Sequence, residues 1–365
     1  MAQIRLQNLR KAFADFVAVK GSTFAIESGS FFAMLGPSGC GKTTTLRMIA
    51  GLELPTDGQI FLDGQDVTRQ RAAERDIAFV FQLFALYPHM NVTDNIGFPL
   101  KCQSTRRAEI RKQVAEAARL LRIEHLLSRK VSNLSGGDRQ RVALGRAIVR
   151  RPKAFLMDEP LGALDAELRR DMCEELRDLH DRVGATTVYV THDQMEAMSM
   201  ADRIAVMNHG VVEQIGAPQE IYDMPTSMFV ADFVGSPPMN FIRFEGRLAP
   251  HDQSVRVGEA SVRIPEARES APSEALVLGV RPEHVLLSDA SPVRGRVFGT
   301  EYLGTTQIVT LDLAQGQIKA RLPSGAPARM GETVGIAFKS DSLIVFDGPS
   351  GRALRSALHE GVRHV

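Results

Sequence analysis

The sequence predicts an α/β domain followed by a smaller all-β domain, and two observations carry this prediction. Over residues 1–235, short apolar runs of strand length alternate with amphipathic stretches of helical period, which is typical of α/β domains. Over residues 236–365 the pattern changes to short strands separated by turn residues, as in a small barrel or sandwich. The Gly-Ser-Pro-Pro segment at 235–238 has the composition of a linker between the two.

Composition narrows the class of protein. A chain of 365 residues suits two domains of ordinary size, and a net charge of +1 gives no reason to expect a nucleic-acid partner. Cys40, Cys102 and Cys173 lack paired spacing, which fits a reducing cytoplasm. We expect no signal peptide, and no apolar run approaches the ~18–20 residues that span a bilayer. Any role at a membrane would therefore depend on partner chains.

Individual elements of the first domain can be predicted from apolar runs. Phe31–Leu35 predicts a buried strand, followed by a helix over Lys42–Ala50 that Gly51 ends. Further buried strands are expected at 77–81, 154–158 and 187–191. Two amphipathic helices present apolar stripes that we assign to core packing. The stripes consist of Ile110, Val114, Ala117 and Leu121, and of Met172, Leu176, Leu179 and Val183.

The second domain is expected to be built from seven strands. They cover residues 241–248, 275–280, 293–298, 306–313, 318–322, 333–338 and 343–346. Residues 281–284 are assigned to a structural turn between two of these strands.

A glycine-rich loop follows the first buried strand. Its sequence, Gly36-Pro-Ser-Gly-Cys-Gly-Lys-Thr, fits the pattern G-x-x-x-x-G-K-[ST] between a strand and a helix. Glycines permit the curvature that turns backbone N–H groups onto phosphate oxygens, and the helix dipole adds attraction. Lys42 is expected to reach the β and γ phosphates, and Thr43 to ligate Mg²⁺. The predicted triphosphate site comprises Gly36, Pro37, Ser38, Gly39, Cys40, Gly41, Lys42, Thr43 and Thr44.

Polar residues also follow the other buried strands. Asp158 and Glu159 end one strand, where the first can hold Mg²⁺ and the second can polarise water. His192 ends another strand and could contact the γ-phosphate from the same sheet edge. Gln82 could touch both the metal and the water, although alone it would be an ordinary loop glutamine.

A second anion-binding helix N-terminus lies in the segment Leu-Ser-Gly-Gly-Asp-Arg-Gln-Arg at 134–141. Ser135, Gly136 and Gly137 precede a helix expected to run to about Arg150. Because the chain has one phosphate loop, this second anion-binding helix N-terminus needs a triphosphate that is bound by another chain. Two chains related by a two-fold axis satisfy that need.

The complete set of motifs resembles the ATP-binding subunits of ABC transporters. GPSGCGKTT, FQLFALYPHM, LSGGDRQRVALGRA, FLMDEPLGALDA and VTHDQ are similar to that family's Walker A, Q-loop, signature, Walker B with D-loop, and H-loop. The resemblance implies a P-loop NTPase domain of the ABC ATPase type at 1–235, with a helical subdomain at about 88–150. It also implies ATP and Mg²⁺ as cofactors.

The resemblance implies a role for each motif residue. Phe13 would stack on adenine, and Thr43, Gln82 and Asp158 would serve Mg²⁺. Glu159 would be the general base, and His192 would steady the γ-phosphate. Ser135, Gly136, Gly137 and Asp138 would complete the partner's site, and Asp165 would couple the two sites.

Asp138 departs from the family pattern, which usually has Gln at this position. A carboxylate near a γ-phosphate is repelled by about 4 kcal/mol per unit-charge pair at about 4 Å and an effective dielectric constant of about 20. We therefore expect Asp138 to point toward ribose hydroxyls or toward arginines such as Arg141.

Two segments indicate the kind of transporter. Gly-Ser-Pro-Pro-Met-Asn-Phe at 235–241 and Leu-Gly-Val-Arg-Pro-Glu-His at 278–284 resemble the linker and regulatory domain of maltose-importer-type ATPases. The resemblance implies an OB-like (TOBE-type) regulatory domain at 236–365. Residues 83–90 resemble the groove that accepts a helix from membrane subunits, although a buried helix-entry segment explains them equally well.

The function expected from this resemblance is ATP hydrolysis coupled to uptake of a carbohydrate or polyol. Expected partners are a second ATPase subunit, identical or related, transmembrane permease subunits, and a periplasmic or lipid-anchored solute-binding protein. The chain would lie peripherally on the cytoplasmic face of the inner membrane. Alternatives are an importer ATPase for a polyamine, iron or an anion, and a soluble ABC ATPase acting on ribosomes or nucleic acid. The single cassette and near-neutral charge disfavour the last.

Overall fold

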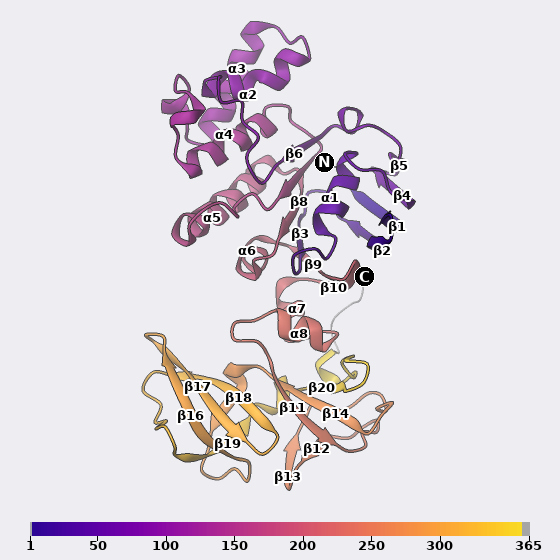
Figure 1. The fold of residues 1–365 in the computed structure, drawn as a ribbon, viewed down its shortest axis with the longest axis vertical. Helices are drawn as coiled ribbons and strands as arrows, with labels where there is room; N and C mark the ends of the chain where they lie inside the picture. The colour runs from indigo at the N-terminus through magenta and orange to yellow at the C-terminus, as the bar shows by residue number, and fades with distance from the viewer. Residues whose placement is uncertain (1, 360–365) are drawn as a thin grey trace. The chain divides into compact units, whose positions relative to one another are not determined.

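The computed structural model describes residues 2–359, which divide into two compact units, the first ending at Pro218 and the second beginning at Gln219 (Figure 1). Within the described residues, none of the helices combines the length and apolar character needed to cross a bilayer.

A six-stranded sheet in the order β10-β9-β3-β8-β7-β6 forms the centre of the first unit (Figure 1). The strands from β9 to β6 run parallel, and β10 pairs antiparallel with β9. Every residue of β3 and β8 is buried, as expected of parallel strands covered on both faces. The bounds are β3 Phe31–Leu35, β6 Ile77–Val80, β7 Ala154–Asp158, β8 Thr186–Thr191, β9 Arg203–Asn208 and β10 Val211–Gly216.

A second, antiparallel sheet in the order β2-β1-β4-β5 packs onto the same core. Leu6 and Ile60 from this sheet join Met34 of β3 and Leu46 of helix α1 (Lys42–Ala50) in one apolar cluster. The four strands are β1 Ile4–Phe13, β2 Phe16–Ile26, β4 Asp57–Leu62 and β5 Gln65–Asp66. None of them was among the strands predicted from apolar runs, because their side chains alternate between buried and exposed.

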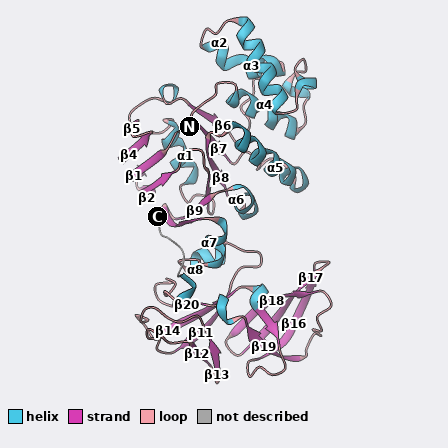
Figure 2. Cartoon of the chain, turned by 180° about the vertical axis from the view of Figure 1, so that it is seen from behind, coloured by secondary structure: helices cyan, strands magenta, loops and turns pink. Residues whose placement is uncertain are grey.

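Three helices lie between β6 and β7 in the chain and pack together, as Figure 2 shows. They are α2 Val92–Cys102, α3 Arg107–Leu120 and α4 Gly136–Ile148. The stripe predicted on α3 is buried. Helices α5 (Ala166–Val183) and α6 (Gln194–Met200) follow β7 and β8, and the α5 stripe is buried except for the half-buried Val183.

Helix α7 (Pro218–Asp223) begins at the last residue of the first unit, and the second unit contains the rest of it, helix α8 (Met228–Phe233) and three antiparallel sheets. The sheets have the strand orders β11-β14-β20, β12-β13 and β15-β19-β16-β17-β18. The bounds are β11 Asn240–Glu245, β12 Ser254–Val257, β13 Ala260–Arg263, β14 Ala275–Val280, β15 Val285–Leu287, β16 Arg294–Tyr302, β17 Thr306–Leu313, β18 Gly316–Pro323, β19 Thr333–Phe338 and β20 Ile344–Asp347.

Three of the seven predicted strands, now β14, β17 and β19, have the predicted bounds. Strand β16 runs on to Tyr302, because a bulge between Val297 and Gly299 lets the pairing with β17 continue. The prediction of a structural turn at 281–284 is confirmed. Arg281 is 1% exposed, and its guanidinium donates to the carbonyl oxygens of Tyr222 and Ala231.

Candidate nucleotide site

The glycine-rich loop connects β3 to α1 and leaves no room for side chains at two of its positions. Gly41, the N-cap of α1, has φ 103°, and a Cβ there would lie 2.4 Å from the Ala18 carbonyl oxygen. A Cβ on Gly36 would lie 2.2 Å from the Met207 carbonyl oxygen. The backbone therefore packs against its neighbours as only glycine allows, and the amino end of α1 opens from it.

Lys42 lies inside the curve of this loop. Its Nζ donates to the carbonyl oxygens of Gly36 (2.7 Å) and Pro37 (3.0 Å), and the residue is 4% exposed. Phosphate oxygens are stronger acceptors for an ammonium group than these carbonyls. Burial raises the pKa of the neighbouring Cys40 thiol, which favours the space-filling interpretation of that residue over a redox role.

Thr43 and Asp158 meet between the start of α1 and the end of β7. The Thr43 hydroxyl donates to Asp158 Oδ1 at 2.8 Å. Burial raises the pKa of Asp158, the Thr43 hydrogen bond opposes that rise, and the nearby Glu159 charge adds to it. A cation beside the two oxygens would relieve this burial of negative charge.

The donor set suits Mg²⁺. This ion is usually held by one or two carboxylates together with substrate phosphates. Within residues 2–359 no cluster of three His, Cys, Asp or Glu side chains could hold a metal on its own. Asp158 and Thr43 offer one carboxylate and one hydroxyl oxygen, which fits a Mg²⁺ shared with nucleotide phosphates.

Glu159, Gln82 and His192 come together at the carboxyl edge of three neighbouring strands. Glu159 Oε2 lies 3.3 Å from His192 Nδ1 and 3.4 Å from Gln82 Nε2. The backbone of Glu159 has φ 43°, and its N–H donates to the carbonyl oxygen of Val190 in β8. A left-handed conformation at a non-glycine residue costs about 1–3 kcal/mol and is concentrated at functional sites.

The segment 134–141 starts helix α4 with Ser135 as its N-cap, and Gly136 and Gly137 form the first turn. The Ser135 hydroxyl donates to Asp138 Oδ2 at 2.8 Å, and Asp138 Oδ1 lies 3.4 Å from Arg141 Nη1. The expected contact between Asp138 and Arg141 is therefore present. Arg141 also pairs with Glu175 at 2.8 Å, and this hydrogen bond is the main cause of its raised pKa.

Other predicted site residues make no polar contact with the phosphate loop in the described part of the chain. Within residues 2–359 no hydrogen bond or ion pair joins that loop to Phe13, to Asp165 or to residues 135–138. The Phe13 ring is 44% exposed, and Lys11 Nζ lies 4.7 Å from its centroid.

Sequence reasoning missed Arg146, which holds the chain just after Gln82. Its guanidinium donates to the carbonyl oxygens of Phe84 (2.8 Å) and Ala85 (2.6 Å), and both of these residues have positive φ. Burial lowers the pKa of Arg146. Its place on α4 was visible in the sequence, but the strained turn that it supports was not.

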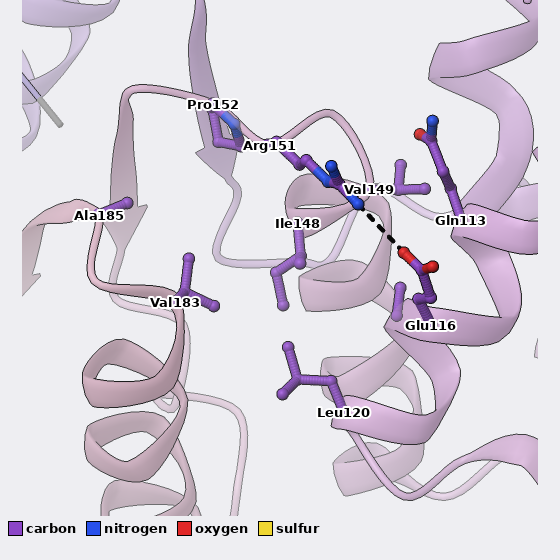
Figure 3. A pocket seen from close by; sticks show the side chains of 10 residues that line it. Gln113, Glu116, Leu120, Ile148, Val149, Arg151, Pro152, Val183 and Ala185 are labelled. Atoms are coloured by element: carbon purple, nitrogen blue, oxygen red, sulfur yellow. Dashed lines mark hydrogen bonds and ion pairs between the residues drawn. The ribbon is translucent and has the colours of Figure 1, made fainter.

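A pocket of about 440 Å³ lies at the opposite edge of the sheet (Figure 3). Pro152 and Ala185, which precede β7 and β8, line it together with apolar side chains of α3, α4 and α5. Glu116 and Arg151 form an ion pair of 3.1 Å at its rim. This hollow is therefore separate from the phosphate loop, which lies at the carboxyl edge.

Comparison with known families agrees with the motifs. Residues 19–162 match the family described as ABC transporter. Residues 235–285 match the MalK OB fold domain, and residues 278–346 match the TOBE domain. The second unit is therefore an OB-like, TOBE-type domain.

Curated relatives match over nearly the whole chain. The trehalose/maltose import ATP-binding protein MalK of Thermococcus litoralis is 45% identical over 97% of this chain and 100% of its own length. The trehalose import ATP-binding protein SugC of Mycobacterium tuberculosis is 44% identical over 97% of this chain and 98% of its own. The sn-glycerol-3-phosphate import ATP-binding protein UgpC of Cereibacter sphaeroides is 45% identical over 97% of this chain and 100% of its own.

Solved structures match the first unit. The dimeric structure of MJ0796, a bacterial ABC transporter cassette, is 33% identical, with a TM-score of 0.53 over 59% of this chain and 98% of that one. Together, these matches show that the chain belongs to the ATP-hydrolysing, ATP-binding subunits of ABC importers, in the group that contains the sugar-importer ATPases.

Proposed function

We propose that this subunit uses ATP hydrolysis to drive uptake of a carbohydrate or a polyol-type solute. The convergence of Gln82, Glu159 and His192 beside the Thr43–Asp158 pair supports the hydrolytic half of the proposal. The solute class rests on the relatives, whose names specify trehalose, maltose and glycerol 3-phosphate. Those names disfavour the alternatives of a polyamine, iron or inorganic-anion importer and of a soluble ATPase acting on ribosomes or nucleic acid.

Each residue then has a distinct task. Lys42 exchanges its loop carbonyls for phosphate oxygens, and residues 36–41 surround the phosphates with backbone N–H groups. Thr43, Asp158 and Gln82 would hold Mg²⁺, which supplies positive charge to the phosphate oxygens when it is bound. Glu159 accepts the proton of the attacking water, and His192 hydrogen-bonds the γ-phosphate.

A second chain completes the site. The chain is proposed to work with a dimer partner and with permease subunits, in line with the dimeric structure of the MJ0796 cassette and with relatives named as import ATP-binding proteins. In the proposed dimer, residues 135–138 of each chain cover the nucleotide of the other, and Asp165 connects the two sites. We further propose that the transporter receives its solute from a solute-binding protein. The chain itself would lie peripherally on the cytoplasmic face of the inner membrane.

Replacement of Glu159 by Gln tests the hydrolytic site. The Glu159→Gln chain should bind ATP and dimerise, while its turnover falls by roughly 10²–10⁴-fold because the general base is lost. ATP binding, dimer mass and steady-state phosphate release would be measured on the full chain. Glu174→Gln, on the exposed face of α5, is the matched control and should behave as wild type. Undiminished turnover in Glu159→Gln would disprove the assigned role.

The class of transported solute can be tested only on the assembled transporter. The chain would be purified with its permease and binding-protein partners, reconstituted in vesicles, and assayed for ATP hydrolysis stimulated by maltose, trehalose or glycerol 3-phosphate. We expect one of these carbohydrate or polyol solutes to raise turnover, because transport and hydrolysis are coupled. Stimulation only by a polyamine, iron or an inorganic anion would contradict the solute class and leave the ATPase assignment intact.

A further inference from the structure

One guanidinium connects the loop before α5 to the loop before α6. Arg169, in the first turns of α5, donates from Nη2 to the Leu164 carbonyl oxygen at 2.9 Å. Its Nη1 lies 3.3 Å from Asp193 Oδ2, and its Nε lies 3.6 Å from Glu196 Oε1. A single rigid side chain therefore contacts two loops that are distant in sequence.

The Asp193 end of this connection is anchored in the core. Glu196 is 4% exposed, and its Oε2 accepts hydrogen bonds from Tyr189 (2.8 Å) and Thr191 (2.6 Å). Burial raises the pKa of Glu196, and the two hydrogen bonds and the Arg169 charge oppose that rise. The carboxylate is thus held in place from two sides, by β8 and by Arg169.

The residues that flank His192 both belong to this network. Thr191 Oγ1 accepts from the Asp193 N–H at 2.9 Å and donates to Glu196. Asp193 is the N-cap of α6, where its side chain accepts from the Met195 N–H. His192, whose Nδ1 faces Glu159, therefore lies between Asp193, which Arg169 contacts directly, and Thr191, which is joined to Arg169 through Glu196.

The Leu164 end lies next to Asp165. The Asp165 side chain caps α5 by accepting from the Leu168 N–H at 3.0 Å, and Arg169 holds the carbonyl immediately before it. A shift of residues 164–165 must therefore change the contacts of Arg169 or move the side chain with it.

We propose that Arg169 is a positioning residue that couples loop 161–165 to His192, so that a change at one loop is transmitted to the other. This inference rests on the roles proposed above for Asp165 and His192. Arginine suits the task because its planar fork makes several directed hydrogen bonds at once, whereas a lysine ammonium is a single point. Arg169 is 30% exposed, but the side chain of Glu196 is only 5% exposed, so removing Arg169 also takes a compensating charge away from a buried carboxylate. Removal of Arg169 should therefore lower stability as well as alter geometry.

The chain supplies a matched control on the same helix. Arg177, two turns further along α5, donates to the Met200 carbonyl oxygen (2.8 Å) and pairs with Asp202 (2.8 Å) and Asp181 (3.0 Å). Its exposure of 32% matches that of Arg169, and it shares no ion-pair partner with Arg169. Arg177→Met therefore removes a backbone contact and two ion pairs from an equally exposed arginine, with more exposed partners, without breaking the connection.

The test compares Arg169→Met with Arg177→Met in the full chain. We expect Arg169→Met to lower kcat at least about tenfold relative to Arg177→Met, since displacement of a catalytic group by about 1 Å can lower rates 100-fold. The dissociation constant for ATP should agree between the two variants. Arg169→Met should have the lower Tm, because the buried Glu196 carboxylate loses its partner, so kcat is compared at a temperature at which both variants are folded. The Hill coefficient for ATP should fall toward one only in Arg169→Met. Equal kcat and equal Hill coefficients would overturn the proposal.

Further variants identify which claim fails. If Arg169→Met does not fold, Arg169→Lys decides, with at least a threefold loss of kcat expected and wild-type kcat contradicting the proposal. Asp193→Asn should add little to the loss in Arg169→Met, and fully additive losses would refute the shared contact. Two catalytic variants separate this inference from the proposed site. Wild-type turnover of ATP in both Glu159→Gln and His192→Ala would overturn the proposed site and this inference together. If those two variants lose turnover while Arg169→Met keeps wild-type turnover, only this inference is overturned.

Discussion

At the scale of single residues, Asp138 is the position where this chain differs from its family and where charge matters most. Its carboxylate is 25% exposed, accepts from the Ser135 hydroxyl and lies 3.4 Å from Arg141. In the proposed dimer it faces the partner's triphosphate, with like charge. Arg141 offsets that charge, but it is shared with Glu175.

This arrangement predicts that Asp138→Gln lowers the KM for ATP and leaves kcat within about threefold, because one repulsive charge is removed. The difference should shrink as salt rises from about 0.01 to 0.5 M, since screening weakens partly exposed charges. Arg141→Met should do the opposite and raise KM. Steady-state hydrolysis at two salt concentrations measures both, and a higher KM in Asp138→Gln would show that the carboxylate helps to bind nucleotide.

At the scale of elements, what could be predicted depended on how each strand is buried. Strands β3 and β7 lie between two layers and are continuous apolar runs, so their bounds followed from composition. Strands β1 and β2 alternate between buried and exposed residues and contain bulges, which leaves no such run. Burial on one face is a weaker signal when the register shifts within the strand.

Which contacts of the site could be predicted from the sequence also depended on the strands. Glu159 and His192 could be expected together because both end parallel strands, and β7 and β8 proved to be neighbours with β6 beside them. The contact between Arg169 and Glu196 could not be expected, because charged residues on exposed helix faces are far more common than such bridges. It depends on how α5 and α6 pack, which only the folded chain shows.

At the scale of the whole molecule, the phosphate loop and the Ser135 segment of one chain share no hydrogen bond or ion pair within residues 2–359. They are instead proposed to meet across a two-fold axis. Each site of a dimer would then contain Lys42 and Glu159 from one chain and Ser135 from the other. This division can be tested without a structure of the complex.

Two inactive chains should restore activity when they are mixed. Lys42→Met disables the loop of its own chain, whereas Ser135→Arg blocks the site of its partner. A mixed dimer therefore keeps one intact site, built from the Ser135→Arg chain's loop and the Lys42→Met chain's lid. Random pairing makes about half of the dimers mixed, and each mixed dimer has one intact site out of two. About a quarter of wild-type turnover is therefore expected if the sites act independently.

Lys42→Met mixed with Glu159→Gln is the control, because both changes disable a chain's own site and no mixed dimer has an intact one. Phosphate release no greater than the sum of the separate variants would show either that the lid does not come from a second chain or that one intact site does not turn over alone.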